Sequence, residues 1–103
     1  MTDTPPSYPT SRNPFADHVG FTMDPPVPGE STSRLQIAPQ HLNPNGVLHG
    51  AVLYAMADTG MGAAVFPTLA EGELCATIEI KMSYFKALVR GEVVCRTVLV
   101  NRG

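Results

Sequence analysis

A single carboxylate inside an apolar stretch is the feature of this sequence that first points to chemistry. Asp58 carries the only formal charge between Pro39 and Ala70, and small or apolar residues surround it. A helix that is apolar on every side is normally buried, and an ionised carboxylate costs free energy there unless it is paired, hydrated or used. We weigh two interpretations equally: a general base, and a structural aspartate bound to a backbone amide.

A second polar group stands at the start of the same stretch. His49 and Gly50 precede a predicted helix over residues 51–66, where unpaired N–H groups and the positive end of the helix dipole attract anions and ligand oxygens. Since Gly50 has no side chain, a ligand oxygen could approach its amide closely, as in an oxyanion hole. The alternative is that Gly50 only lets the chain turn and His49 caps or packs. Asn43 and Asn45 lie in a turn, where asparagine is ordinary.

The spacing of these residues predicts a site shared between two chains. Asp58 follows Gly50 by eight positions, about 12 Å along a helix, so one carbonyl cannot contact both groups of one helix. Two antiparallel helices related by a two-fold axis would set Asp58 of one chain opposite Gly50 of the other. Gly60 and Gly62 would permit close approach of the two helices or close packing on the chain's own sheet, and both interpretations stay open.

The elements that position these residues follow from hydrophobic periodicity. Residues 31–38 and 74–85 alternate between apolar and polar, which predicts strands, and the second pattern is the clearer. Residues 93–100 are rich in β-branched side chains and predict the next strand of an antiparallel hairpin with 74–85. Residues 14–19 predict a short helix with Asn13 as its cap and Pro14 at its first position, and residues 21–23 predict a strand. One helix against an antiparallel sheet is an α+β fold.

Composition narrows the function classes. The 103 residues suffice for one domain, which we expect over 14–103, after a loose proline-rich tail over 1–13. The net charge of −2, without a run of Lys or Arg, excludes a nucleic-acid-binding protein. No secretory signal is visible, and His49, Asp58 and Pro67 disfavour a membrane span, so we expect a cytoplasmic protein without a membrane partner. Cys75 and Cys95 lack metal-ligand spacing, which predicts buried free thiols and no metal site.

Three segments resemble a known family. Residues 43–51, Asn-Pro-Asn-Gly-Val-Leu-His-Gly-Ala, followed by Ala-Asp-Thr at 57–59, resemble the signature of hotdog-fold acyl-CoA thioesterases of the phenylacetate-pathway type. Residues 77–86 look like that family's next strand, and residues 13–15 with 18–20 look like its opening segment. The resemblance implies a hotdog fold, in which a curved antiparallel sheet wraps a long central helix, and a homodimer or homotetramer. It also implies hydrolysis of an acyl-CoA thioester, in which coenzyme A is part of the substrate and no cofactor is needed.

The resemblance also implies a role for each matching residue. Asp58 matches the catalytic carboxylate, which acts as a base on water or as a nucleophile, and Gly50 matches the amide that polarises the thioester carbonyl. Asn43 matches the side chain that positions the carbonyl or the water across the dimer interface. His49 matches the supporting motif histidine, and Thr77 falls where some members hold water with a hydroxyl.

The sequence also departs from the family pattern. Ala51 replaces a common second glycine, Ala87 replaces a common proline, and the chain stops where the family continues with about two more strands. The missing strands favour an alternative function, a non-catalytic acyl-CoA-binding or dimerisation module. A hotdog hydratase or dehydratase is disfavoured, because its catalytic histidine should follow within a few positions of Asp58, where this chain has Thr-Gly-Met-Gly-Ala.

Overall fold

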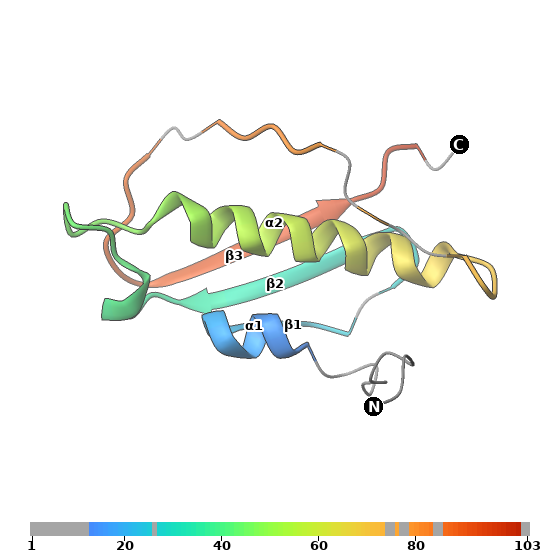
Figure 1. Cartoon of the computed structure of the whole chain (residues 1–103), viewed down its shortest axis with the longest axis horizontal. Coiled ribbons are helices and arrows are strands. Elements are labelled where there is room, and N and C mark those ends of the chain that lie inside the picture. Colours follow the sequence, from blue (N-terminus) through green and yellow to red (C-terminus); the bar gives the residue numbers. More distant parts are fainter. Residues whose placement is uncertain (1–12, 26, 74–75, 77–78, 84–85, 102–103) are drawn as a thin grey trace, which may run out of the picture.

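A long helix packed on a three-stranded antiparallel sheet forms the centre of the molecule (Figure 1). The computed structural model describes residues 13–25, 27–73, 76, 79–83 and 86–101. The strands lie side by side in the order β1 (Phe21–Met23), β2 (Glu30–Gln36), β3 (Glu92–Val98). The helices are α1 (Pro14–Val19) and the long α2 (Gly50–Val65), with 3-10 turns η1 (Pro39–His41) and η2 (Phe66–Thr68). This arrangement is the predicted α+β class.

The short helix α1 forms where its capping residues predict it. The Asn13 side chain accepts a hydrogen bond of 3.0 Å from the Ala16 N–H, and Pro14 occupies the first turn. Asparagine satisfies an otherwise unpaired N–H there, and proline's fixed φ suits that turn. Gly20 ends the helix with φ of 105°, a left-handed conformation that glycine adopts without strain. The prediction for residues 13–19 is therefore confirmed.

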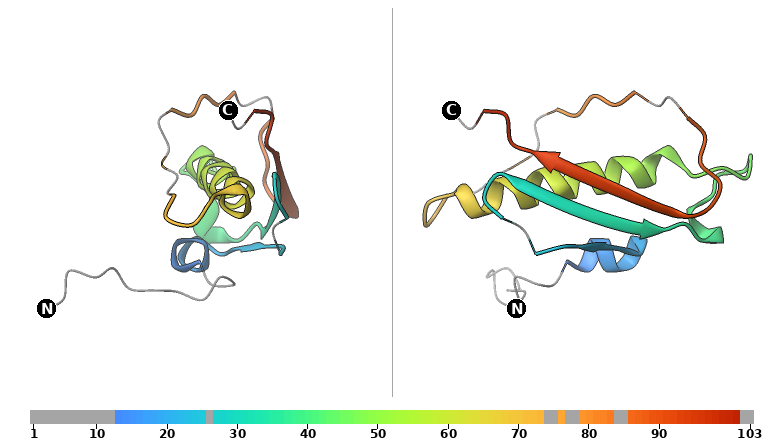
Figure 2. Two further views of the ribbon diagram at one scale, coloured as in Figure 1. Left: turned by 90° about the vertical axis from the view of Figure 1, so that its right-hand side faces the viewer. Right: turned by 180° about the vertical axis from the view of Figure 1, so that it is seen from behind.

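The sheet presents its inner face to α2, and the bulky part of the core lies near the start of the helix. Figure 2 shows α2 on one face of the sheet. On β2, Leu35 points inward and lies opposite Phe21 of β1 and Val93 of β3. Phe21, Leu35 and Met56 of α2 are fully buried. Each such side chain contributes about 1.5–3 kcal/mol of burial free energy.

Towards its carboxyl end α2 approaches the sheet through small residues instead. The Ser31 hydroxyl donates a buried hydrogen bond of 2.6 Å to the Gly60 carbonyl. A Cβ added at Gly60 would lie 2.7 Å from Thr97 Oγ1, whereas one added at Gly62 would meet nothing within 4 Å. Gly60 therefore serves packing on the chain's own sheet. The other interpretation, close approach of a second helix, stays a prediction for Gly62 alone.

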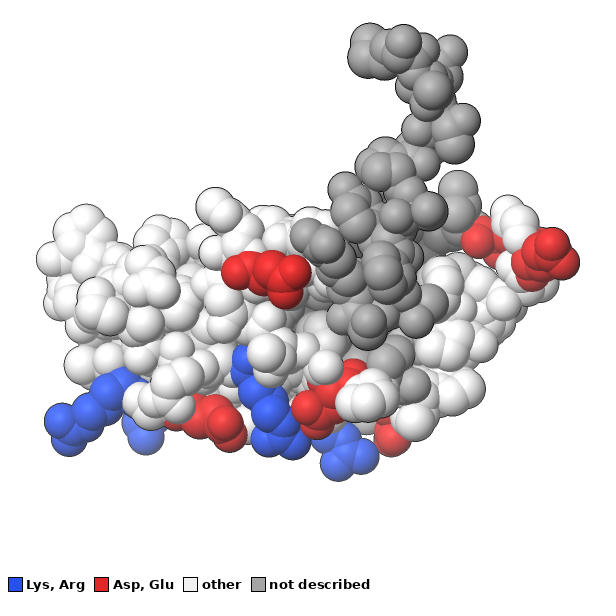
Figure 3. Space-filling view, turned by 90° about the horizontal axis from the view of Figure 1, so that it is seen from below, with Lys and Arg blue, Asp and Glu red and all other residues white. Residues whose placement is uncertain are grey.

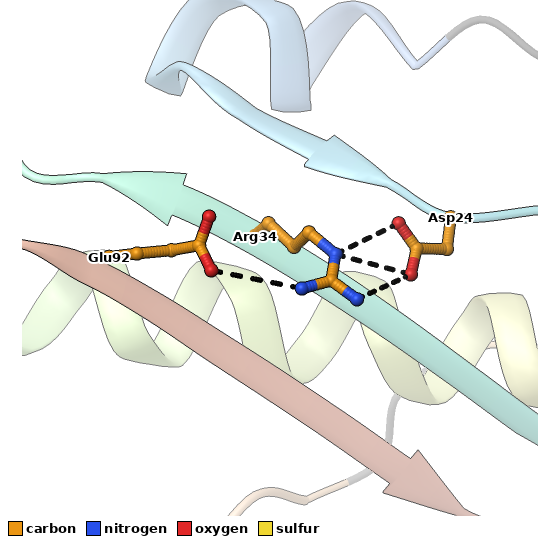
Figure 4. Close-up of polar contacts among 3 residues, drawn as sticks. All are labelled: Asp24, Arg34 and Glu92. Carbon is orange, nitrogen blue, oxygen red and sulfur yellow. Dashed lines mark hydrogen bonds and ion pairs between the residues drawn. The ribbon is translucent and has the colours of Figure 1, made fainter.

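The outer face of the sheet carries paired charges of both signs. Arg34 of β2 lies between two carboxylates, with Nη2 3.1 Å from Asp24 Oδ2 and Nη1 3.7 Å from Glu92 Oε1 (Figure 4). The hydrogen bonds to Asp24, together with its charge, raise the pKa of the Arg34 guanidinium above its usual value. Arg96 of β3 similarly contacts Glu30 of β2 at 3.3 Å. Figure 3 shows charged side chains of both signs gathered along one side of the molecule.

The strand predicted over residues 74–85 differs from the structure. The described residues in that range, 76 and 79–83, form no strand, and the rest of the range lies outside the described residues. The predicted hairpin with residues 93–100 is likewise not formed by the described residues 76 and 79–83, and the strand that the structure pairs with β3 is β2, over seven residues. An alternating pattern indicates which side chains are covered, but a strand also needs backbone hydrogen bonds to a neighbouring strand. Figure 1 shows residues 79–83 apart from the paired strands.

The two α2 glycines should respond oppositely to alanine. We expect Gly60→Ala to lower the free energy of unfolding by roughly 1–2 kcal/mol, because overpacking against Thr97 and Ser31 outweighs the gain in helix propensity. Gly62→Ala, the matched control, should raise it by up to about 1 kcal/mol. Urea unfolding followed by circular dichroism measures both, and equal shifts would contradict the packing described for Gly60.

Candidate active site

The start of α2 is fixed by its own capping histidine. His49 Nδ1 accepts a hydrogen bond of 2.9 Å from the Ala51 N–H, which makes His49 the N-cap and Gly50 the first helical residue. The His49 N–H in turn donates to the His41 carbonyl at 2.8 Å. The structure shows that His49 caps the helix, whereas its supporting role in a reaction stays a prediction. The cap fixes the direction in which the Gly50 end of the helix points.

The loop before this cap is held by Asn43. Its Oδ1 accepts hydrogen bonds from the N–H groups of Asn45, at 2.9 Å, and Val47, at 3.3 Å. Gly46 completes the turn with φ of 77°. The side-chain carbonyl of Asn43 is thus engaged in the loop, so Nδ2 is the part of this residue suited to contact a substrate.

Buried His41 ties this loop to α1, a role that the sequence analysis missed. Its Nδ1 accepts from the Ala38 N–H at 2.9 Å, and its Nε2 lies 2.6 Å from the Val19 carbonyl. Since Nδ1 is an acceptor, Nε2 carries the proton and donates to Val19. The sequence feature that could have indicated this role is the position of His41 three residues after Ala38, across the turn that begins at Pro39.

A cavity of about 480 Å³ opens beside the start of α2. Gly50 and Leu53 of the helix line it together with Leu48 of the preceding loop. Lys86 and Ala87 line it from the other side, and Lys86 is its one charged lining residue in the described part of the chain. A second cavity of about 360 Å³ continues along β3 and shares Leu53 and Lys86 with the first. Lys86 is a further residue that the sequence analysis did not single out.

Asp58 lies on a neighbouring stripe of α2, away from Gly50. The positions 54, 58 and 61 recur at helical spacing and share one face. Tyr54 and Met61 are 42% and 39% exposed, and Asp58 between them is half-buried. Both residues lie on the one helix α2, in which eight residues rise by about 12 Å. Within one chain, Asn43, His49 and Gly50 therefore lie together in the loop and at the start of α2, whereas Asp58 lies away from them.

The remaining expected residues add little to the site. Thr77 and Cys75 lie outside the described residues. Cys95 is a free, half-buried thiol on the second cavity. Within the described ranges, no cluster of three or more His, Cys, Asp or Glu side chains could hold a metal ion. The helices described are also too short or too polar to cross a membrane.

Comparison with known proteins decides the family. A family model described as the thioesterase superfamily matches residues 45–103. The chain belongs to the thioesterase superfamily. Its fold is the hotdog fold that the resemblance implied, with one long central helix and an antiparallel sheet.

Solved structures of similar proteins agree with that assignment. A mutant of the phenylacetic acid degradation protein PaaI from Thermus thermophilus is 32% identical, with a TM-score of 0.78, and the match covers 88% of this chain and 76% of that one. The conserved protein PA5202 from Pseudomonas aeruginosa is 27% identical, with a TM-score of 0.80 and coverage of 90% and 74%. The thioesterase HI1161 from Haemophilus influenzae is 25% identical, with a TM-score of 0.79 and coverage of 86% and 62%.

A curated relative is similar over a smaller share of its length. The Archaeoglobus fulgidus protein named "Putative esterase" is 30% identical over 76 residues, which are 73% of this chain and 47% of that protein. The chain thus spans about half the length of this relative.

The capping role of His49 can be tested apart from any reaction. His49→Ala removes the acceptor for the Ala51 N–H, so we expect the thioesterase-superfamily chain to lose about 1 kcal/mol of unfolding free energy. His49→Asn keeps a side-chain acceptor at the N-cap and should lose less than half as much. Denaturant titrations of both variants check this. Equal losses would show that His49 stabilises the fold by packing and not by capping.

Proposed function

We propose that this protein hydrolyses acyl-CoA thioesters to a free acid and coenzyme A in the cytoplasm. Superfamily membership supports thioester hydrolysis, and the start of α2 supplies a suitable place for the carbonyl. In the reaction, water adds an oxygen to the acyl carbon, the carbon–sulfur bond breaks, and the thiolate leaves as coenzyme A. The apolar cavity beside Gly50 is large enough to hold part of an acyl or pantetheine chain.

The observation that carries this proposal is the place of Asp58 on α2. It is the one charged residue of the helix and lies between two exposed apolar side chains, Tyr54 and Met61. A stripe of this kind is suited to contact with a second apolar surface, which would surround the carboxylate with protein. We assign Asp58 the role of base on the attacking water or of nucleophile, two roles that this proposal leaves open.

A second copy of the chain completes the proposed site. Antiparallel pairing of two α2 helices with Asp58 opposite Gly50 places residue 54, midway between them, near the two-fold axis. Each site then contains Asp58 of one protomer and Gly50 of the other. The Gly50 N–H would donate a hydrogen bond to the carbonyl oxygen and stabilise the negative charge that develops on it. Asn43 of that second protomer would donate through Nδ2 to the carbonyl or the water, and Thr77 would help to hold the water. His49 acts indirectly, because it orients the helix end.

Loss of the Asp58 carboxylate should remove turnover and leave binding. We expect Asp58→Ala to lower kcat for thiol release from a panel of acyl-CoAs by about 10²–10⁴-fold, the usual contribution of a positioned acid–base group. Binding of the CoA ester, measured by calorimetry, should persist. Asp17→Asn, which removes an exposed carboxylate from α1, is the control. Wild-type rates in Asp58→Ala would end the enzymatic proposal, and binding by a wild type that releases no thiol would select the non-catalytic acyl-CoA-binding module.

Mixing two inactive variants tests the shared site directly. Asn43→Asp keeps the Oδ1 bonds of the loop but removes the Nδ2 donor, whereas Asp58→Ala keeps Asn43 and Gly50. A heterodimer of the two has one site in which every group is native, so random mixing should restore about a quarter of wild-type activity. Activity that stays at the level of the single variants would place all catalytic groups within one chain.

A further inference from the structure

The segment 39–49, which leads from β2 to α2, is tied to distant parts of the chain from two sides. On one side, the Leu48 N–H donates a hydrogen bond of 2.6 Å to the Leu88 carbonyl. On the other side, the ring of His41 lies 2.6 Å from the Val19 carbonyl at the end of α1. Hydrogen bonds within the segment give it its shape, and these two long-range bonds place it relative to the rest of the fold. The second of them is made by a side chain, so a substitution can remove it.

Both ring nitrogens of His41 are engaged, in opposite senses. Nδ1 accepts a hydrogen bond of 2.9 Å from the Ala38 N–H, so Nε2 carries the proton and donates to the Val19 carbonyl. That carbonyl belongs to the last turn of α1, where carbonyls have no partner within the helix. His41 is only 4% exposed, and a buried polar group that loses its partner costs free energy. Gly20 leaves room for the ring, because a Cβ there would lie 3.3 Å from Nε2.

The backbone of His41 carries this position on to the start of α2. Its carbonyl accepts the His49 N–H at 2.8 Å, and His49 Nδ1 accepts the Ala51 N–H at 2.9 Å. Three hydrogen bonds in sequence therefore connect the end of α1 to the first turn of α2 through two histidines. Gly50 lies between His49 and Ala51, so a displacement of the His41 backbone would displace the Gly50 amide as well.

Of the two ring bonds of His41, the bond to Val19 holds the segment in place. The bond to Ala38 closes a turn that the His41 N–H also closes, by donating to the Ala38 carbonyl at 2.9 Å. Loss of the Nδ1 acceptor would thus leave the turn closed. The bond to Val19 joins residues 22 positions apart and has no such duplicate among the described contacts of the ring.

We propose that His41 is a positioning residue for thioester hydrolysis, which acts through its Nε2–H bond to Val19. The chemical consequence rests on the proposed function, in which the Gly50 amide stabilises the charge on the carbonyl oxygen. Such a donor is effective only at hydrogen-bond distance from the place that the oxyanion will occupy. A misplacement of about 1 Å by a residue away from the chemistry can cost about 10²-fold in rate.

Two amide variants separate the ring bonds. The side chain of His41→Gln can reach the Val19 carbonyl with its N–H₂ group, whereas that of His41→Asn keeps an acceptor near the position of Nδ1 and is too short to reach Val19. We expect His41→Asn to lower kcat by about 10²-fold with little change in KM, because the lost interaction belongs to the transition state. His41→Gln should retain most of the wild-type kcat.

The control is a variant that loses stability without touching this segment. Met23→Ala removes a partly buried side chain of β1 that packs against the core. It should unfold at a lower urea concentration than the wild type and keep the wild-type kcat when it is folded. Circular dichroism verifies that all three variants are folded under the conditions of the assay.

Amide signals measure the structural step without any reaction. In ¹H–¹⁵N NMR spectra recorded without substrate, the signals of Gly50 and Ala51 should shift in His41→Asn and stay near their wild-type positions in His41→Gln and Met23→Ala. This measurement still decides the structural step if the wild type releases no thiol, a result that would end the proposed function instead.

Mixed dimers show in which half of the shared site His41 acts. A mixture of His41→Asn with Asp58→Ala should regain about a quarter of wild-type activity, as a mixture of Asn43→Asp with Asp58→Ala should. A mixture of His41→Asn with Asn43→Asp should regain none, because both changes affect the half that contains Gly50.

Three results would each overturn the inference. The first is that the Gly50 and Ala51 signals of His41→Asn stay at their wild-type positions. The second is that His41→Asn keeps the kcat of an active wild type. The third is that His41→Gln loses as much activity as His41→Asn, which would assign the effect to burial of the ring and not to its bond with Val19.

Discussion

The close contact between Gly60 of α2 and the inner face of the sheet fixes the arrangement of the whole molecule. Ser31 donates to the Gly60 carbonyl, and Thr97 fills the space where a side chain would otherwise stand. Bulkier residues, Met56 and Leu35, fill the wider space at the other end. A helix held at both ends in this way cannot rotate about its axis, because rotation would replace Gly60 with a residue that has a side chain. The same contact therefore decides which face of α2 points outward.

That orientation explains why the site residues fall into two separate groups. With Gly60 and Met56 turned toward the sheet, the outward stripe is the one that holds Asp58 between Tyr54 and Met61. Gly50 lies at the end of the same helix, fixed by its histidine cap. No rearrangement within one chain can close a separation set by the rise of a straight helix. The packing that makes the fold rigid is thus also the reason why the proposed chemistry requires two chains.

Elements that depend on residues close together in the sequence could be predicted from it. Elements that depend on contacts between distant parts of the chain could not. The cap at Asn13, the turn at Asn43 and the apolar helix depend on residues within a few positions, and the structure has all three. The alternating pattern over residues 74–85 predicted a strand, but strand formation depends on a neighbour that the described residues do not supply. Which strand pairs with β3, and the anchoring of the loop by His41, likewise depend on contacts between distant parts of the chain. Asp58, His49 and Gly50 became candidates through their residue types and positions in the sequence, whereas their specific roles, and Thr77, came from the resemblance to a family.

The charged outer face of the sheet is better understood as a selector of strand register than as a source of stability. Arg34 and its partners are exposed, and an exposed ion pair contributes only about 0–1 kcal/mol. Buried side chains such as Leu35 contribute more, so removing these charges would leave the fold intact. Their positions still affect the strand register. Like charges that face each other disfavour a wrong register, even where opposite charges add little stability to the correct one. Within the chain, Arg34 of β2 and Glu92 of β3 form one pair of opposite charges between neighbouring strands, and Glu30 of β2 and Arg96 of β3 form a second.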